Sequence, residues 1–449
     1  MGGLAGSVVD EQGFTWDLGG HVIFSHYKYF DELTSSAVDE WYTHQRESWV
    51  WIEDRWVPYP FQNNIHRLSN ESKQKCLEGL IKAAERRLAH EKPRNFQEWI
   101  DQRFGPGLAD LFMNPYNYKV WGIRPSGMSA QWMGERVALV DLPRVTNNVV
   151  HNKDDLSWGP NAIFKFPGHG GTGEIWKRVA RRLPQEKLKL NAALVSIDFE
   201  SKQITLQDGS KVSYDTLIST MPIDKLIQAS NGHDDWKAKS AGFVHSATHI
   251  IGVGLAGTPP PHLQGKCWMY FPEANCPFYR VTLFSHYSPN HVPKVEMPPG
   301  AAAEDSNPAG FWSLMLEVCE SDNKPLPEGC DIVQLSIEGL LNTKLITKDD
   351  KIVSKWHKRL EYGYPTPFVG RDELLAELQP KLEALGVFSR GRFGGWKYEV
   401  GNQDHSLMQG VEVADRILLG IEEETYNYPD LVNGRKVTSR FYGNGQRLF

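Results

Sequence analysis

The fold depends on how residues 1–27 are interpreted, MGGLAGSVVDEQGFTWDLGGHVIFSHY. A glycine-rich opening passes almost at once into a strand-like run, and a second Gly-Gly turn follows at Gly19 and Gly20. Glycine is the residue that most readily takes the backbone conformations of tight turns. We interpret this stretch as the middle of a structural unit rather than its start.

Further along the chain, periodicity predicts a helical region. Apolar residues recur at three and four positions across 70–88, with Asn70 as the N-cap. Asn95 followed by Glu98 resembles a capping arrangement and opens a second helix, which Gly105 would end. The helical region predicted in this way covers 66–146.

Strand-like patterns follow in two groups. Residues 188–200 and 203–206 alternate, and Asp208-Gly209 supplies a hairpin turn, which predicts an antiparallel insert. Residues 242–287 and 311–337 are rich in Val, Ile, Tyr, Phe and Trp, which predicts a second sheet. A helix is expected at about 404–421. The fold class is therefore mixed, with α/β and α+β parts.

The composition excludes several classes of protein. Of 449 residues, 40% are hydrophobic and 23% charged, and the mean hydropathy is −0.45, which argues against disordered, collagen-like and membrane-spanning chains. Lys and Arg number 49 against 55 Asp and Glu, so the net charge of −6 gives no general attraction to nucleic acid or an anionic membrane. An anionic ligand must be held by local groups.

The cysteines and the absence of a leader indicate the compartment. Five cysteines are scattered without the paired spacing of a zinc site or a disulfide framework, which favours a reducing compartment. The longest stretch without Asp, Glu, Lys or Arg, 240–265, contains three consecutive prolines and is no spanning helix. With no signal peptide at the start, we expect a cytoplasmic protein with no membrane and no nucleic-acid partner.

One glycine motif has two interpretations. Gly168, Gly170 and Gly173 satisfy a G-x-G-x-x-G pattern between a short apolar run and a helix. A dinucleotide fingerprint needs a buried apolar strand before the first glycine, and Lys165 and Pro167 interrupt that run. We favour a glycine-rich turn that packs a helix N-terminus near a ligand.

Arginine and aromatic residues cluster in three later segments, CWMYFPEANCPFYR, YGYPTP and GRFGGWKYEVGNQDHS. Arginine is a forked, permanently charged donor suited to phosphate, tyrosine adds a neutral donor, and aromatic faces can stack on a base or flavin. These clusters suit a nucleotide diphosphate. No metal-ligand spacing and no nucleophile elbow is found, so the sequence predicts no metal and gives no support to a hydrolase.

Nine segments follow one another in the order of a known family. They are WDLGGHVIFSHYKYFD, WYTHQR, WVPYPFQNNI, DLFMNPYNYKVW, GERVA, WGPNA, CWMYFPEANCPFYR, GYPTP and GRFGGWKYEVGNQDHS. The chain thereby resembles the eukaryotic, fungal-type UDP-galactopyranose mutase family from Gly2 nearly to the C-terminus. The resemblance implies a flavin enzyme, with reduced FAD as the active form and NADPH as the reductant, that interconverts UDP-galactopyranose and UDP-galactofuranose without net redox change.

The resemblance also implies the domain organisation. The expected fold is a Rossmann-like FAD/NAD(P)-binding domain with a helical domain and an antiparallel β-sheet substrate domain. The ranges are a discontinuous FAD-binding domain at 1–30, 147–236 and 386–425, a helical UDP-binding domain at 66–146, a sheet domain at 31–65 and 237–385, and a C-terminal extension at 426–449. A homo-oligomeric state is left open.

Site residues are carried over position by position. Reduced flavin is the nucleophile at the anomeric carbon in this family, so the protein must hold the departing diphosphate. Arg136 and Arg280 match the diphosphate-clamping arginines, and His21 matches a mobile histidine beside the flavin. The matching substrate-binding positions are Tyr59, Gln62, Phe112, Asn117, Trp121, Asn161, Trp268, Tyr270, Tyr364, Tyr398 and Asn402. The matching cofactor positions are Gly2, Gly3, Leu4, Gly19, Gly20, His21, Arg46, Ser48, Arg392 and Gln403.

One departure from the family pattern bears on the cofactor. Family members begin with a strand-turn-helix-strand unit that carries the true G-x-G-x-x-G fingerprint, and this chain starts at the far end of that unit. We therefore expect an N-terminally incomplete FAD domain that lacks its first βαβ unit. Two alternatives stay open: a flavin amine-oxidase-like oxidoreductase, and a truncated, non-catalytic UDP-sugar-binding paralogue.

Overall fold

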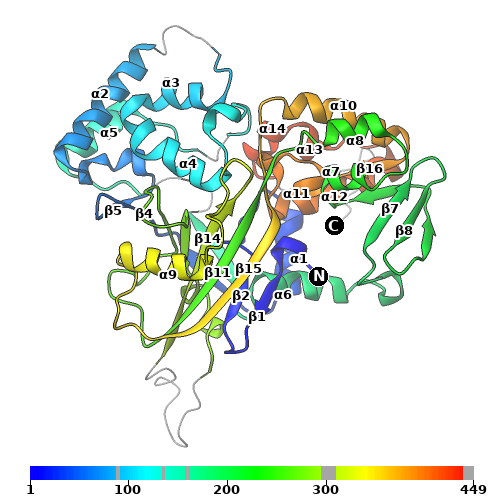
Figure 1. The fold of residues 1–449 in the computed structure, drawn as a ribbon, viewed down its shortest axis with the longest axis horizontal. Coiled ribbons are helices and arrows are strands. Elements are labelled where there is room, and N and C mark those ends of the chain that lie inside the picture. The colour runs from blue at the N-terminus through cyan, green and yellow to red at the C-terminus, as the bar shows by residue number, and fades with distance from the viewer. Residues whose placement is uncertain (87–91, 134–136, 157–158, 160–161, 295–309, 438–449) are drawn as a thin grey trace, which may run out of the picture.

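A seven-stranded sheet forms the centre of the molecule (Figure 1). The computed structural model describes residues 1–86, 92–133, 137–156, 159, 162–294 and 310–437. All neighbouring strands of the sheet pair antiparallel except β12 and β4, which are parallel. The strand order is β15 (Ile352–Pro365), β11 (His245–Ala256), β14 (Phe311–Glu320), β13 (Arg280–Leu283), β12 (Trp268–Tyr270), β4 (Ser48–Ile52) and β5 (Arg55–Pro58).

Four helices cover one end of this sheet, beyond β4 and β5 (Figure 1). They are α2 (Asn70–Arg86), α3 (Phe96–Leu108), α4 (Asn114–Trp121) and α5 (Leu142–His151). Their apolar side chains share one core with residues of β4 and β5, among them Val50 and Val57. We call this group the helical cluster.

One predicted helix end in this cluster needs correction, and two are confirmed. The N-cap of α2 is Ser69, whose Oγ accepts a hydrogen bond from the Ser72 backbone N at 3.3 Å, while Asn70 is the first helical residue. Gly105, with φ 69° and ψ 174°, breaks the helix as predicted, and a further helical turn begins at Pro106, which needs no N–H at the start of a turn. The predicted cap at Asn95 is confirmed, since its side chain accepts from the Glu98 backbone N.

The remaining elements lie around the sheet, with α7, α8 and α10 to α14 gathered opposite the helical cluster (Figure 1). Early in the chain these are β1 (Ser7–Val9), β2 (Thr15–Asp17), α1 (Lys28–Ala37), β3 (Trp41–Gln45), β6 (Ile163–Pro167) and α6 (Gly171–Arg181). Later come β7 (Leu194–Asp198), β8 (Gln203–Leu206), β9 (Lys211–Ser213), β10 (Leu217–Ser219), α7 (Ile223–Gln228), α8 (Asp234–Ser240) and α9 (Ile332–Asn342). The chain continues through α10 (Arg371–Ala384), β16 (Val387–Ser389), α11 (Gly391–Gly394), α12 (Gln403–Leu419), α13 (Glu424–Asn427) and α14 (Pro429–Asn433).

The predicted antiparallel pairing of the strands is confirmed, but several predicted strands have the wrong length. β7, β8 and β9 form the predicted antiparallel insert, although residues 188–193 stand outside the strand. The prediction of strand at 311–337 is wrong after residue 320, because Asp331 caps α9 by accepting from Val333 N and Gln334 N. The 14-residue strand β15 was not predicted.

The domain ranges given above remain a prediction. The pairing of the β-strands shows which parts of these ranges lie next to one another. β4 and β5 extend the central sheet, whereas β3, from the same predicted range, pairs with β6. β10 and β16 pair in parallel although 170 positions separate the paired residues Ile218 and Phe388. Of the C-terminal extension, residues 438–449 lie outside the described part. Within that part, no helix has the length and apolarity needed to cross a membrane.

Two glycines of β11 let an aromatic pair pack flat on the sheet. A Cβ atom built at Gly252 would lie 2.5 Å from the Trp16 ring, and one at Gly254 would lie 2.5 Å from the Phe14 ring. Residues two apart on a strand face the same side. Phe14 and Trp16, both fully buried, therefore dock the β1–β2 pair onto the sheet.

We expect Gly252→Ala to destabilise the chain by about 1–3 kcal/mol, because the new methyl group overpacks against the Trp16 indole. The matched control is Gly410→Ala in α12, where nothing lies within 4 Å of the new Cβ and alanine favours the helix. Urea denaturation followed by far-UV circular dichroism measures both. Equal midpoints for the two variants would contradict the packing argument.

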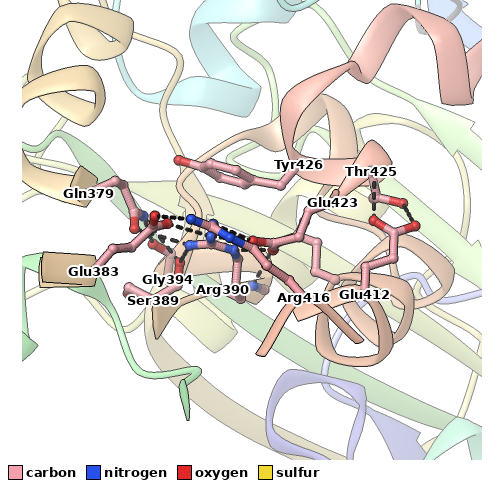
Figure 2. Close-up of polar contacts among 12 residues, drawn as sticks. Gln379, Glu383, Ser389, Arg390, Gly394, Glu412, Arg416, Glu423, Thr425 and Tyr426 are labelled. Carbon is pink, nitrogen blue, oxygen red and sulfur yellow. Dashed lines mark hydrogen bonds and ion pairs between the residues drawn. The ribbon is translucent and has the colours of Figure 1, made fainter. Parts of the chain in front are cut away.

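A buried ion network fixes the end of β16 (Figure 2). The Arg390 guanidinium is 1% exposed and donates to both carboxylate oxygens of Glu423, at 2.5 and 2.7 Å, and to Glu383 at 2.6 Å. Arg416 of α12 donates to the same two carboxylates. The network ties α10, α12 and β16 together immediately before Gly391.

Candidate active site

A cavity of about 1020 Å³ opens between the central sheet and the N- and C-terminal segments. Its walls come from 1–5 and 18–24, from β11 to β15 of the sheet, from α6, and from 391–407. Of the residues predicted to bind substrate or cofactor, the cavity wall contains Gly2, Gly3, Leu4, Gly19, Gly20, His21, Arg46, Tyr59, Trp268, Tyr270, Arg280, Tyr364, Arg392, Tyr398, Asn402 and Gln403. The structure thus brings together residues from opposite ends of the sequence.

Arg280 is held by a buried carboxylate in the cavity wall. Its Nε and one terminal nitrogen donate to the two oxygens of Glu317 at 2.9 and 2.7 Å. Tyr279 Oη donates to the same carboxylate at 2.6 Å. Burial acts against the charge of Glu317, but Arg280 and Tyr279 outweigh it and hold the pKa of Glu317 below its ordinary value. The guanidinium is thereby oriented before any ligand arrives.

Gly20 is the point where the N-terminal segment meets this pair. Its backbone N donates to Glu317 Oε1 at 2.9 Å, and a Cβ atom there would lie 2.7 Å from that oxygen and 2.9 Å from an Arg280 nitrogen. A side chain at position 20 would displace the ion pair. The Gly-Gly turn is therefore required by close approach.

His21 lines the cavity next to that turn as a neutral imidazole. Burial lowers the pKa of His21 to about 4, against the opposing attraction of Glu317. Its Nδ1 atom has no hydrogen-bond partner within the described part of the chain. A buried, unsatisfied ring nitrogen is costly unless a ligand completes it.

The tyrosines of the wall are neutral donors. Burial raises the pKa of Tyr364 to about 12 and also raises the pKa of Tyr270. Arg392 lies over the Tyr364 and Tyr398 rings, at 5.0 and 5.5 Å from their centroids. The cavity therefore presents uncharged hydroxyl groups beside arginine side chains, which suits a phosphate-bearing ligand.

The N-terminus of α12 faces the cavity through Asn402 and Gln403. Behind it, Asp404 accepts a hydrogen bond from the His26 backbone N at 3.0 Å, and its carboxylate lies 2.9 Å from His26 Nδ1 and 3.2 Å from His405 Nδ1. These three buried groups connect the segment after the Gly-Gly turn to the helix. Main-chain N–H groups at a helix start are available to an anionic ligand.

Five predicted site residues lie behind the wall instead of on it. Asn117 Nδ2 donates to Met113 O, and Gln62 Nε2 donates to Ala138 O. The remaining three are Ser48, which is buried in β4, Phe112, which stacks on Phe61 at 4.6 Å, and Trp121, whose ring lies edge-on to Tyr398 at 4.7 Å. Arg136 and Asn161 fall outside the described residues, so their placement stays a prediction.

Sequence reasoning missed Glu317. A signal was present, because the acidic residue interrupts the apolar run of β14, FWSLMLEVCE, and a charge in a buried strand needs a partner.

For the Gly168–Gly173 motif, the sequence analysis favoured a glycine-rich turn at a helix N-terminus over a dinucleotide fingerprint, and the structure has such a turn before α6. Thr172 at the start of α6 bonds the buried Asp17 carboxylate, so a side chain of this protein already occupies that helix end.

Comparison with known proteins assigns the family. The family model described as flavin containing amine oxidoreductase matches residues 1–248. The chain belongs to this amine oxidoreductase family. The predicted Rossmann-like FAD-binding fold is confirmed with it, and the family assignment makes the chain a flavoprotein.

One solved structure is similar in sequence as well as in fold over nearly the whole chain. It is a crystal structure of reduced UDP-galactopyranose mutase, which is 50% identical with a TM-score of 0.92 and covers 98% of this chain and 91% of its own. A putative protoporphyrinogen oxidase from Exiguobacterium sp. 255-15 is 12% identical, with a TM-score of 0.60 and coverage of 86% and 85%. A fatty acid isomerase from P. acnes is also 12% identical, with a TM-score of 0.56 and coverage of 93% and 90%. These last two show the fold alone.

A short match links this member of the flavin-containing amine oxidoreductase family to a curated protein. Over 109 residues it is 29% identical to the Homo sapiens ribitol 5-phosphate transferase FKRP. The match covers 24% of this chain and spans about a fifth of that protein's length.

Proposed function

We propose that this flavoprotein interconverts UDP-galactopyranose and UDP-galactofuranose, with FAD as cofactor and NADPH as its reductant. The observation that carries the proposal is the cavity wall, in which Arg280 and neutral tyrosines meet a glycine turn and a helix N-terminus. The likeness to a reduced UDP-galactopyranose mutase at 50% identity supports it. The eukaryotic, fungal-type assignment belongs to the same proposal.

The residues of the cavity fit an FAD molecule. The glycines at 2, 3, 19 and 20 line the cavity without side chains, and the unsatisfied His21 nitrogen offers a hydrogen bond. Asn402 and Gln403 place helix N–H groups at the wall, and Trp176 of α6 adds an aromatic face. When bound in its reduced form, FAD supplies the nucleophile for the anomeric carbon of the sugar.

The chain's own task is to hold UDP while the sugar rearranges. The diphosphate carries negative charge that grows as the glycosidic bond breaks, and Arg280 offers a fixed positive charge close to Tyr270 and Tyr364. Because Glu317 orients the guanidinium in advance, little reorganisation is needed as the charge develops. We assign Arg136 to the same clamp, from its motif.

His21 acts without changing charge. With its pKa lowered to about 4 by burial, the imidazole is neutral at physiological pH and can only donate or accept a hydrogen bond. A protonated ring would compete with Arg280 for the Glu317 carboxylate and would repel the guanidinium. We therefore assign His21 a positioning role beside the flavin.

The uracil is held on the side of the helical cluster. Phe112, Asn117 and Trp121 belong to α4 and the turn before it, and the Trp121 ring contacts the cavity residues Tyr364 and Tyr398. Aromatic stacking and amide hydrogen bonds are a suitable means of recognising uracil. Tyr59 and Gln62 complete the proposed uridine contacts.

We expect Trp121→Ala to weaken UDP binding by about 10-fold or more, because the loss of the indole removes an aromatic contact and support for Tyr364 and Tyr398. Isothermal titration of the purified chain with UDP measures this. Trp236→Ala, in α8 outside the cavity wall, is the control and should bind UDP normally. An unchanged UDP affinity in Trp121→Ala would make Trp121 a packing residue only.

Product analysis separates the proposal from amine oxidation. With FAD added and reduced, UDP-galactose should be converted to UDP-galactofuranose, resolved by ion-exchange chromatography. With oxidised FAD, primary amines should yield no hydrogen peroxide, since an amine oxidase has no diphosphate for the arginines to neutralise. Peroxide formation without furanose would favour the oxidoreductase alternative, and UDP binding without either product would favour the non-catalytic one.

A further inference from the structure

Lys119 and Cys276 form a buried amine–thiol pair where the helical cluster meets the central sheet. Lys119 belongs to α4, and Cys276 to the turn between β12 and β13. The Lys119 Nζ atom lies 3.4 Å from Cys276 Sγ, and it donates to Cys276 O at 2.9 Å and to Glu273 O at 2.7 Å. Lys119 is 8% exposed and Cys276 is 5% exposed. Lysine is rarely buried to this degree, so its position against a sulfur atom requires an explanation.

We propose that this pair is an oxidative modification site at which Lys119 and Cys276 become covalently joined. Hydrogen peroxide first converts the thiol to a sulfenic acid: the O–O bond breaks, an S–O bond forms, and one water is released. The Lys119 amine then attacks the sulfur atom. An N–S bond forms, the S–O bond breaks, and the oxygen leaves as a second water with a proton from the nitrogen. Sulfur is oxidised, peroxide is reduced, and the protein loses two hydrogen atoms.

The geometry favours Cys276 over Cys76. A nitrogen attacking a sulfenic acid must reach the sulfur, and Nζ is already in contact with Sγ. Cys76, also buried, interacts instead with the Glu53 carboxylate. The two carbonyl groups that hold Nζ keep it beside the sulfur while oxidation proceeds.

The pair should react faster in mildly alkaline solution. Burial lowers the pKa of Lys119, which favours the uncharged amine, and burial raises the pKa of Cys276, which disfavours the thiolate. The thiolate attacks peroxide and the free amine attacks the sulfenic acid, so both steps speed up as pH rises.

The link would join two parts of the proposed substrate site. It closes a loop of 157 positions between α4, which carries Asn117 and Trp121, and the turn that leads into Arg280. It would hold the helical cluster in a fixed position on the sheet. This consequence rests on the proposed function, whereas formation of the bond does not.

The experiment is peptide mass spectrometry on the purified full chain after hydrogen peroxide treatment at mildly alkaline pH. We expect a cross-linked peptide pair containing Lys119 and Cys276, with two hydrogens fewer than the separate peptides, that dithiothreitol restores to lysine and thiol. A pair that retains one bridging oxygen supports the same assignment. Cys76→Ser should form the link as the unaltered chain does, and Cys276→Ser should not. Recovery of Lys119 only in unlinked peptides, with Cys276 as thiol, sulfinic or sulfonic acid, would overturn the proposal, whether or not the chain turns over UDP-galactose.

Discussion

Replacing Arg280 with alanine is expected to lower UDP-galactose turnover by about 10²–10³-fold while FAD content is unchanged. The guanidinium lies in the cavity wall, already oriented by Glu317, and it offsets the charge that develops on the departing diphosphate. Loss of an interaction made mainly in the transition state lowers turnover more than substrate affinity. Initial rates with dithionite-reduced enzyme, normalised to bound flavin, measure the effect.

The same substitution has a structural cost that must be separated from the catalytic one. Without Arg280, the Glu317 carboxylate is left buried beside Tyr279 and Gly20, which costs about 3–5 kcal/mol when one partner of a buried pair is removed. The control is Arg280→Ala with Glu317→Gln, in which the neutral amide needs no counter-charge. We expect the double variant to regain stability but not turnover. Near-normal turnover in either variant would remove Arg280 from the clamp.

Replacing Arg390 with alanine is expected to destabilise the chain by about 3–5 kcal/mol. The substitution leaves Glu423, which is 0% exposed, and Glu383 without the guanidinium that joins them, and Arg416 at 38% exposure can compensate only in part (Figure 2). Because β16 runs into Gly391 and Arg392 of the cavity wall, flavin retention should fall together with stability. The urea midpoint and bound flavin are the two measurements.

Arg435→Ala is the matched control for that network. Arg435 pairs with Glu424 at the surface, with exposures of 44% and 51%, so its loss should cost less than about 1 kcal/mol. A similar change in the urea midpoint for both variants would contradict the account of a buried network.

Local signals in the sequence predicted the fold where one residue type decides the outcome. The Asn95 cap and the Asp208-Gly209 turn are examples, since each depends on neighbours a few positions away. The prediction failed at α9, because an apolar stretch can suit a strand or a buried helix and the cap at Asp331 was overlooked. The packing of Trp16 on Gly252 joins residues 236 positions apart and has no local signal.

For the candidate site, the motif resemblance identified most of the residues that line the cavity, but it did not identify the carboxylate that holds them in position. Gly20, His21 and Arg280 were named from the sequence, and they lie together at the cavity. Glu317 was not named, although Gly20 and Arg280 both depend on it. Phe112 and Trp121 were named as uracil contacts, and the structure places them among buried aromatic rings next to the cavity wall. Whether such a ring faces the cavity depends on side-chain packing, which the order of motifs in the sequence does not reveal.

The most direct test of the central claim is the flavin absorption spectrum of the purified 449-residue chain after incubation with FAD, followed by UDP-galactose turnover under dithionite. The account predicts bound flavin that survives gel filtration and formation of UDP-galactofuranose from UDP-galactose. A folded protein that remains colourless, or one that binds flavin and yields no furanose, would contradict it.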